Sequence, residues 1–399
     1  MKFSSIRIKN FRNFEDINIK LSNKNVFFGL NDVGKTNFLY ALRFLFDRNI
    51  RKNGFIDSDF FQKNIKNDIE IVVEIDISDT DNDASKLIRS IVKGALRSGD
   101  NSLYIQLKSS YNSQLQYGEP QLMWAGNETN YESIKQIGSF TDLDKIFNVI
   151  YIDAYVNLKE LFSRSLRYIL PDASEEDYDI QKLIDEDIRS LNSHISDLSN
   201  VKSIEEELTP IFNSYQGKEH KVALKSEVSV NGYYSNLTPY IEGPDSEELY
   251  PTAGEGRRKL LAYALYKLLM RKDEGKKINL FLLEEPENHL HKGMQLSLSN
   301  VIFNDDAYEY LFVTTHSPFI LYEMNNVNLV RIYSLGNINS KSYIYKVPYD
   351  FEKSRKLLNS FLAEAIFANR VLLVEGPSEA LLFNKVLLSV KPNYEALGL

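Results

Sequence analysis

The sequence predicts an α/β fold organised around a phosphate-binding loop. Residues 29–36 read G-x-x-x-x-G-K-T, the pattern of a loop that holds the phosphates of a nucleotide. The apolar residues 25–28 before it predict a buried strand, and residues 37–46 after it have helical spacing that ends before Asp47. Strand, glycine-rich loop and helix form the context that this motif needs. A glycine turn without a ligand is the alternative interpretation.

Alternating or apolar runs predict the other strands of this fold. Residues 6–12 and 17–21 alternate apolar and polar side chains, as half-exposed strands do, and they lead into the strand before the loop. Further runs of this kind predict strands over residues 69–77, 103–107, 147–152, 278–283, 310–313 and 370–375.

An acidic region in the middle of the chain predicts a helical insertion over residues 157–220. Its apolar residues recur at helical spacing, at Ile180, Leu183, Ile184, Ile188 and Leu191. Such helices can bind a second subunit, or they can be solvated charged helices without a partner. Sheet-like sequence resumes at 221–225 and 228–230.

This pattern predicts the order of the domains. A nucleotide-binding domain is expected in two parts, 1–156 and 221–345, with the helical insertion 157–220 between them. Residues 346–399 are expected to form a linker and the start of a further domain.

Composition excludes several classes of protein. The 399 residues are 43% hydrophobic and 26% charged, with a net charge of −8 and no cysteine. No apolar run approaches the ~20 residues of a membrane span, and the lack of cysteine excludes disulfides and cysteine-ligated zinc. This usage fits a reducing compartment, so we expect a cytoplasmic protein.

Charge limits how the chain can bind DNA. Because its net charge is negative, DNA binding requires a local basic patch or a metal. The candidate phosphate contacts are Lys9, Arg12, Arg51 and Lys52, although solvated surface charge is the stronger interpretation of these residues.

The phosphate loop provides a specific chemistry. Its glycines let several backbone N–H groups point at one anion, and the following helix N-terminus adds partial positive charge. Lys35 can reach the β- and γ-phosphates of ATP, and the Thr36 hydroxyl can bind Mg²⁺. The predicted nucleotide-binding residues of this segment are Gly29, Asn31, Asp32, Gly34, Lys35, Thr36 and Asn37.

Two acids end the apolar run 278–283. The end of a buried strand beside a phosphate loop is where an α/β nucleotide site needs carboxylates. We assign Glu284 to the Mg²⁺ shell and Glu285 to the attacking water as a catalytic residue. The first position usually holds Asp, so Glu284 is a departure that adds one methylene. The alternative is a strand end with two solvated acids.

Two later segments can complete a nucleotide site. A turn that contains Thr252, Gly254 and Glu255 enters a helix whose N-terminus can face an anion; an ordinary capped helix is the alternative. His316 follows the run 310–313 and can donate a hydrogen bond to a γ-phosphate as a second catalytic residue. A lone histidine is more often structural.

A further pair of acids lies near the end of the chain. Glu375 ends the apolar run 370–375, Gly376 makes a turn, and Glu379 falls in the first turn of a helix. Acids four residues apart can approach one Mg²⁺ or Mn²⁺. Alternatively, Glu379 is only a helix N-terminal acid favoured by the dipole.

Together these motifs resemble an ABC-type ATPase head. The order is phosphate loop, signature-like turn, paired acids, a D-loop-like His289-Leu290-His291 and then His316. The opening residues 6–14 resemble the first strands of chromosome-maintenance and repair ATPases, and residues 371–379 resemble the start of a Toprim domain. An ATPase head followed by Toprim is the layout of the OLD (overcoming lysogenization defect) nucleases. Within that family the chain is similar to the A subunits of Gabija anti-phage systems.

The resemblance implies an ATP-regulated DNA endonuclease in bacterial defence against phage. It implies a homo-oligomer, dimer or tetramer, paired through the helical insertion, that acts on double-stranded DNA beside a helicase-like Gabija B subunit. The turn at Thr252, Gly254 and Glu255 would then face the Lys35 and Glu285 of another subunit. A Q-loop residue is also implied, for which Gln62 is a candidate.

The C-terminus departs from that pattern. A Toprim site needs later acids, whereas the sequence stops at Leu399, so we expect it to end within the domain and to lack competent DNA cleavage. One alternative is an ATP-dependent DNA-binding scaffold or repair-type ATPase, in which Glu375 and Glu379 are structural. An ATP-driven transporter subunit is a third, disfavoured by the lack of a membrane segment.

Overall fold

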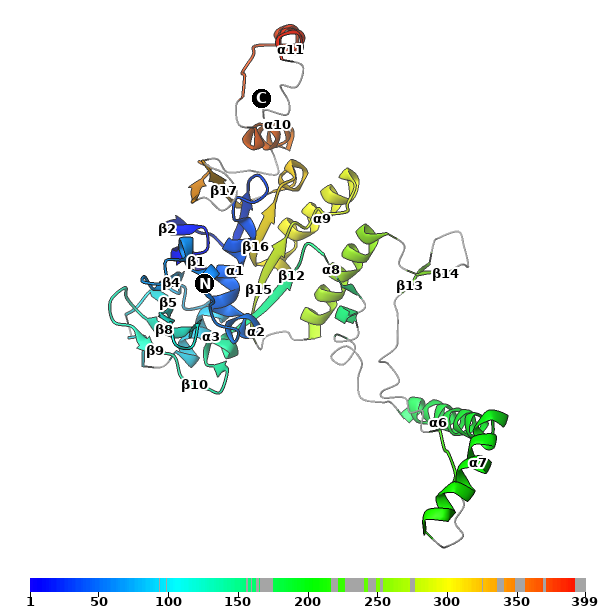
Figure 1. The fold of residues 1–399 in the computed structure, drawn as a ribbon. Helices are drawn as coiled ribbons and strands as arrows, with labels where there is room; N and C mark the ends of the chain where they lie inside the picture. The colour runs from blue at the N-terminus through cyan, green and yellow to red at the C-terminus, as the bar shows by residue number, and fades with distance from the viewer. Residues whose placement is uncertain are drawn as a thin grey trace. The chain divides into compact units, whose positions relative to one another are not determined.

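The fold consists of two compact units, Met1–Val156 with Gly254–Leu399, and Asn157–Ala253. The computed structural model (Figure 1) describes residues 1–92, 94–97, 99–155, 157–158, 160–162, 165, 175–216, 222–226, 240–242, 249–251, 254–272, 277–324, 326–335, 341–348, 356–368 and 371–391. None of the helices in these ranges is long and apolar enough to cross a bilayer.

The first unit contains a six-stranded sheet, which is antiparallel, in the order β2-β1-β4-β5-β8-β9. Its strands are β1 (Lys2–Phe11), β2 (Phe14–Lys20), β4 (Ile69–Asp76), β5 (Ser102–Ser109), β8 (Gln121–Ala125) and β9 (Glu132–Ser133). Strand β4 reads IEIVVEID, and its residues alternate between buried and half-buried. This alternation confirms the period of two on which the strand predictions rest.

A second six-stranded sheet carries the phosphate loop, in the order β12-β15-β16-β3-β17-β18. All its neighbouring strands are parallel except β17 and β18. Its strands are β3 (Lys24–Phe28), β12 (Phe147–Ile152), β15 (Ile278–Glu284), β16 (Tyr310–Thr315), β17 (Asn328–Ser334) and β18 (Ser342–Lys346). The mixed parallel sheet confirms the predicted α/β class.

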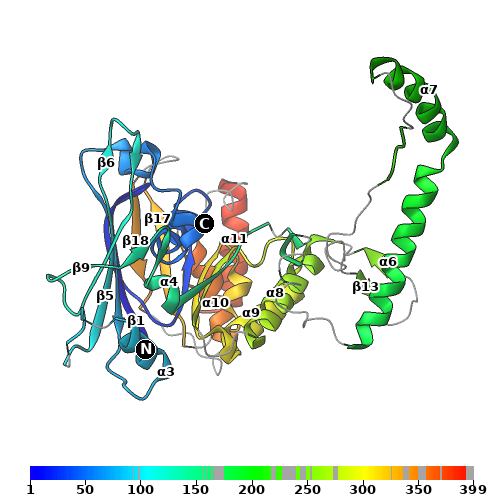
Figure 2. The same cartoon turned by 90° about the horizontal axis from the view of Figure 1, so that it is seen from below.

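Helices cover both faces of the second sheet (Figure 2). Helix α1 (Lys35–Phe46) lies between the two sheets, where Phe38 contacts Phe27 of β3 with ring centroids 4.0 Å apart. The opposite face of the second sheet contacts helices α8 (Glu255–Lys272), α9 (Lys292–Asn304) and α10 (Lys356–Phe367). The predicted helix after the phosphate loop is confirmed, and it ends before Asp47 as expected.

Short elements connect the sheets of the first unit. They are α2 (Arg48–Arg51), α3 (Asp83–Ile91), α4 (Leu143–Ile146), β6 (Tyr111–Asn112), β7 (Tyr117–Gly118), β10 (Gln136–Ile137), β11 (Phe140–Thr141) and the 3₁₀ turns Asp57–Asp59, Phe61–Lys63, Asp306–Tyr308 and Pro318–Leu321.

The second unit is helical, with α6 (Glu175–Ser196), α7 (Ser199–Gln216) and a strand pair, β13 (Tyr240–Glu242) and β14 (Leu249–Pro251). The sheet-like prediction for 221–225 is wrong over the described residues. There the backbone N–H groups of Val222 and Leu224 donate to the Thr209 Oγ1 and Glu205 Oε1 atoms, at 3.2 and 2.7 Å. Side chains of α7 therefore satisfy this extended segment in place of a neighbouring strand.

The strand predicted before Glu375 is also absent over the described residues. Val371–Val374 form no regular structure, and Leu373 is 89% exposed. An apolar run becomes a strand only when a neighbouring strand supplies hydrogen-bond partners, and no described strand pairs with this one. Helix α11 (Pro377–Val390) follows as predicted, with Glu379 in its first turn.

Arg51 is a structural residue of the first unit. Its side chain is 6% exposed, donates to the Leu45 carbonyl at the end of α1, and pairs with Asp144 with 2.5 Å between the Nη2 and Oδ1 atoms. Both interpretations of Arg51, as a DNA contact and as solvated surface charge, are therefore wrong. The charged residues near Arg51 in the sequence do not indicate this ion pair, because Asp144 is far from Arg51 along the chain.

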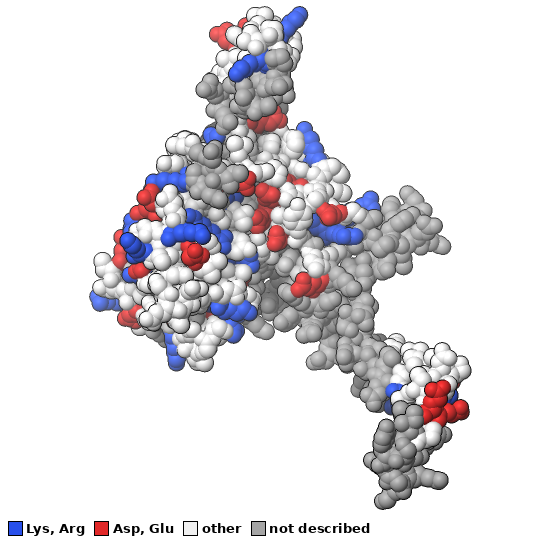
Figure 3. Space-filling model, in the orientation of Figure 1, with Lys and Arg blue, Asp and Glu red and all other residues white. Residues whose placement is uncertain are grey.

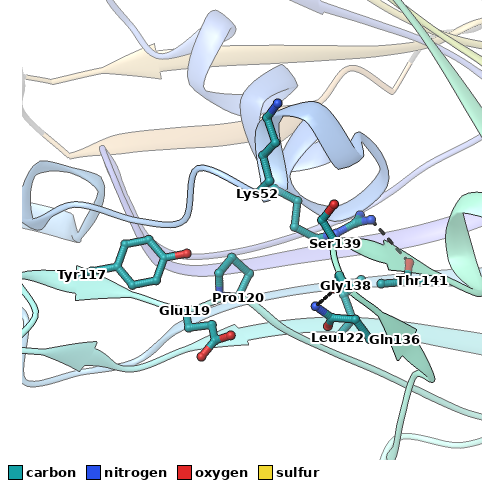
Figure 4. Close-up of a pocket in the computed structure, with 10 residues that line it drawn as sticks. Lys52, Tyr117, Glu119, Pro120, Leu122, Gln136, Gly138, Ser139 and Thr141 are labelled. Carbon is teal, nitrogen blue, oxygen red and sulfur yellow. Dashed lines mark hydrogen bonds between the residues drawn. The ribbon is translucent and has the colours of Figure 1, made fainter.

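A pocket of about 250 Å³ lies beside this ion pair. Figure 4 shows Lys52 at its border, with Tyr117 and Glu119 opposite. No residue of the phosphate loop lines this pocket, so it is a separate feature from the predicted nucleotide site.

Replacing Arg51 should destabilise this unit strongly. Arg51→Met leaves the buried Asp144 carboxylate without its partner, which costs about 3–5 kcal/mol in comparable cases. Lys52→Met, at the neighbouring exposed position, should change stability by less than about 0.5 kcal/mol. Urea unfolding followed by fluorescence of Trp124, the only tryptophan of the chain and part of β8, compares the variants. Equal unfolding midpoints would contradict the assignment.

Candidate functional site

Parallel pairing brings the ends of three strands to one edge of the second sheet. Strand β15 ends at Glu284, β16 at Thr315 and β3 at Phe28, and the three strands are paired in parallel with these ends in register. The phosphate loop follows β3, the second acid of the predicted pair follows β15, and the predicted histidine follows β16. The site residues therefore leave the sheet side by side, as in other open α/β sheets.

The phosphate loop requires glycine at two positions. Gly34 has a φ of +101°, and a Cβ added there would lie 1.9 Å from the Asn13 Nδ2 atom. A Cβ added to Gly29 would lie 2.2 Å from the carbonyl oxygen of Ile332 in β17. The Asn13 amide also donates to the Val33 carbonyl at 3.1 Å, so β1 and β2 help to fix the loop. A side chain at either glycine would displace the loop.

Lys35 is buried within the loop. Its side chain is 6% exposed, and its Nζ donates to the carbonyl oxygens of Gly29 and Leu30 at 3.1 and 2.9 Å. The Glu285 Oε1 atom is 3.7 Å away. Burial lowers the pKa of the ammonium, and the Glu285 carboxylate opposes this effect. A desolvated cation at a helix N-terminus is well suited to the oxygens of a phosphate group.

The remaining loop residues have different roles. Asn31 and Asp32 are exposed, and Asp32 has a φ of +62°. The Asn37 side chain donates to the Asn13 Oδ1 atom at 2.9 Å and accepts from Arg12 at 3.0 Å. Asn37 therefore supports the loop through its neighbours on the β1–β2 turn.

Glu284 contacts the loop directly. The Thr36 hydroxyl donates to the Glu284 Oε1 atom, and Glu284 is 9% exposed. A hydroxyl and a carboxylate are hard oxygen donors of the kind that Mg²⁺ prefers. Because the Thr36 proton is directed at Glu284, the lone pairs of its oxygen remain available to a cation. These two residues therefore fit the Mg²⁺ of a bound nucleotide.

Glu285 has an unusual backbone conformation, with a φ of +42°, just beyond the end of β15. Its carboxylate accepts from Asn288 at 3.0 Å, and its Oε1 atom lies 3.3 Å from the His316 Nδ1 atom. The hydrogen bond with His316 lowers the pKa of Glu285 to about 2. This carboxylate is ionised at neutral pH and can accept a hydrogen bond from a water beside the phosphates.

Glu287, which was not among the predicted site residues, anchors the histidine. It is 2% exposed, and its Oε1 atom accepts from the Thr315 hydroxyl at 2.6 Å and from the backbone N–H groups of His316 and Ser317 at 2.8 and 3.2 Å. His316 thus lies between Glu285 and Glu287, which raises its pKa. The available signal was a third acid two residues after Glu285, beyond Pro286.

Lys259 is a second residue that was not among the predicted site residues. It belongs to α8, is 2% exposed, and its Nζ donates to the carbonyl oxygens of Glu285 and Ala154 at 2.6 and 3.1 Å. Burial lowers its pKa to about 8. Lys259 therefore connects α8, the helix that begins at the signature-like turn, to the backbone of Glu285.

The signature-like turn also contacts the segment after the acids. Gly254 is exposed with a φ of +82°, and the Glu255 Oε2 atom lies 2.9 Å from the His289 Nε2 atom. Thr252 lies outside the described residues.

Other predicted residues are not brought to this site. Gln62 is exposed in a 3₁₀ turn, and Glu375 and Glu379 are exposed at the start of α11. Among the described residues, no group of three or more histidines and acids gathers as a metal cluster.

The basic residues proposed as DNA contacts have acidic neighbours. The Lys9 Nζ lies 3.6 Å from Glu70, and the Arg12 Nε lies 2.9 Å from Asp59. On the face in Figure 3, Lys and Arg are interspersed with Asp and Glu. The described residues of that face therefore form no broad single-sign surface of the kind that steers nucleic acid.

The His316 contacts predict a pH-dependent stability. A histidine whose pKa is raised in the folded protein stabilises the fold fully below pH 6.5, its ordinary pKa. This stabilisation is lost as the pH rises through the raised pKa. Glu285, whose pKa is lowered in the folded protein, stabilises the fold fully above pH 4.5. This stabilisation is lost as the pH falls toward about 2. Without nucleotide, His316→Gln should therefore lower the melting temperature most between pH 4.5 and 6.5, and progressively less above it. His194→Gln, exposed on α6, is the control. A pH-independent difference would contradict the pairing.

Comparison with known proteins agrees with this geometry. The family model of the AAA ATPase domain matches residues 1–321. Endonuclease GajA of Bacillus cereus is 44% identical over 100% of this chain and 70% of its own length. The OLD nuclease of Thermus scotoductus is 24% identical over 98% of this chain and 75% of its own, and an ATP/GTP phosphatase of Helicobacter pylori is 25% identical over 78% and 85%. The chain therefore belongs to the AAA ATPase domain family and, within it, to the OLD-type proteins that include endonuclease GajA.

Proposed function

We propose that this chain forms the ATP-binding and ATP-hydrolysing head of an ATP-regulated DNA endonuclease. The observation that carries the proposal is the convergence of Lys35, Thr36, Glu284 and Glu285 at one sheet edge. Phosphoryl transfer is catalysed mainly by positioning and charge stabilisation, and this edge offers a buried cation, two acids and a helix N-terminus.

Each residue has a specific role in this proposal. Lys35 would exchange its carbonyl acceptors for phosphate oxygens, and Thr36 with Glu284 would hold Mg²⁺, which supplies positive charge at the phosphates when bound. Glu285 accepts a hydrogen bond from the attacking water and orients it. His316, kept between Glu285 and Glu287, donates toward the terminal phosphate.

Two variants separate binding from turnover. Lys35→Ala removes charge-assisted hydrogen bonds, so ATP affinity measured by calorimetry should fall at least 10-fold. Glu285→Gln should bind ATP as well as the native protein does and hydrolyse it about 100-fold more slowly, measured as phosphate release. Lys52→Ala, exposed and outside the site, is the control. Unchanged ATP affinity in Lys35→Ala would reject the phosphate loop as the binding site.

The proposal includes a site shared between subunits. Gly254 and Glu255, with Thr252, would face nucleotide held by Lys35 of a second copy of the chain. Exposed apolar residues on α6, such as Ile180 and Leu183 at 57% and 61% exposure, support self-association through the predicted helical insertion 157–220. We also propose, from the resemblance to Gabija systems, that the chain acts with a helicase-like Gabija B partner in anti-phage defence.

The nuclease part rests on the names of the relatives and on the acids of α11. Endonuclease GajA and an OLD nuclease both align with nearly the whole chain. Glu375 and Glu379 would contribute to a Toprim site for Mg²⁺ or Mn²⁺, and both are exposed and accessible. The boundaries 1–156, 221–345 and 346–399 remain our proposal for the two head parts and the Toprim start.

Cleavage of duplex DNA tests this part. In a protein that joins this chain to a complete Toprim domain, Glu379→Gln should lower Mn²⁺-dependent cleavage at least 10-fold by loss of one charged ligand, while ATP hydrolysis is unchanged. Lys385→Gln, on the same helix, is the control. Equal cleavage by the native protein and Glu379→Gln, or no cleavage by either, would favour the ATP-dependent DNA-binding scaffold.

A further inference from the structure

Tyr151 contacts the Mg²⁺-binding acid from a neighbouring strand. It lies on β12, the edge strand of the second sheet, where it pairs in parallel with Leu282 of β15. Its hydroxyl donates to the Glu284 Oε2 atom, while the Thr36 hydroxyl donates to Oε1. Both oxygens of the Glu284 carboxylate are therefore held, each by a hydroxyl from a different element.

The surroundings of Tyr151 keep its hydroxyl in place as a donor. The Arg43 guanidinium of α1 stacks on its ring, with the Cζ atom 3.6 Å from the ring centroid. The Tyr266 hydroxyl of α8 lies 3.5 Å from the Tyr151 carbonyl oxygen. A phenol is protonated at neutral pH, so the Tyr151 hydroxyl donates to the Glu284 carboxylate.

The need for such a contact follows from the residue at position 284. Glutamate has one more rotatable bond than the aspartate that usually occupies this position, and this freedom must be lost when the carboxylate is fixed. Thr36 alone fixes one oxygen and leaves the carboxylate free to turn. A second donor at the other oxygen removes that freedom before any cation arrives.

We propose that Tyr151 is a positioning residue that orients Glu284 for the divalent cation of the nucleotide site. The inference rests on the proposed nucleotide-dependent function and adds to it the residue that compensates for glutamate in place of aspartate. Tyr151 contacts Glu284 rather than the cation, so its removal should weaken the metal site without removing a ligand.

The direct test is Mn²⁺ binding to the ADP-loaded protein, followed by electron paramagnetic resonance. Tyr151→Phe should raise the Mn²⁺ dissociation constant about 10-fold, the usual effect of losing a hydrogen bond to a charged group. The Mg²⁺ concentration that half-saturates ATP hydrolysis should rise by the same factor, while kcat at saturating Mg²⁺ is retained. Tyr263→Phe is the matched control, because its buried hydroxyl has no hydrogen-bond partner among the described residues.

A second variant tests the same inference from the other partner. Glu284→Asp is too short to reach both hydroxyls, so it should also weaken Mn²⁺ binding about 10-fold, and adding Tyr151→Phe should then change little. Unchanged Mn²⁺ affinity in Tyr151→Phe would overturn the proposal. If Tyr151→Phe does not fold, unchanged Mn²⁺ affinity in Glu284→Asp would overturn it instead. Native protein that binds Mn²⁺ and ADP but releases no phosphate would contradict the ATPase function alone.

Discussion

The site depends on the parallel pairing of β15, β16 and β3. This pairing brings the ends of the three strands to one level, so a lysine at position 35 and acids at 284 and 285 meet although they are far apart in sequence. A shift of one residue in register would turn each side chain to the opposite face of the sheet. The apolar interiors of these strands, buried on both faces, therefore determine the chemistry at their ends.

Charges at this edge compensate one another without nucleotide. Lys35 lies near Glu285, Glu285 near His316, and His316 near the buried Glu287. Lys35 and Glu287 are buried, so an unpaired charge at either would be costly, whereas His316 keeps 42% of its side chain exposed. In the proposed function, a phosphate group beside Lys35 would take the place of the carbonyl acceptors, and the helix N-terminus would add to its stabilisation.

Residues that follow strands in recognisable motifs were predictable, and residues that act across the sheet were not. Lys35 and Thr36 lie in a loop motif that follows a recognisable strand, Glu284 ends another, and His316 follows a third. Tyr151 is separated from Glu284 by 133 positions, and only the strand order brings β12 beside β15. The error at Arg51 has a similar cause, because burial against Asp144 depends on tertiary contacts. The run Val371–Val374 has strand composition but no described strand to pair with.

Lys259 gives the signature-like helix a mechanical connection to the second acid. Its ammonium is almost fully buried and donates to the Glu285 carbonyl, at a residue whose φ of +42° already departs from strand geometry. A buried ammonium that loses its acceptor is strongly destabilised, so α8 and Glu285 have to move together. The turn at Gly254 and Glu255 begins the same helix. A ligand or subunit that displaces this turn would therefore move Glu285, the carboxylate to which we assign the attacking water.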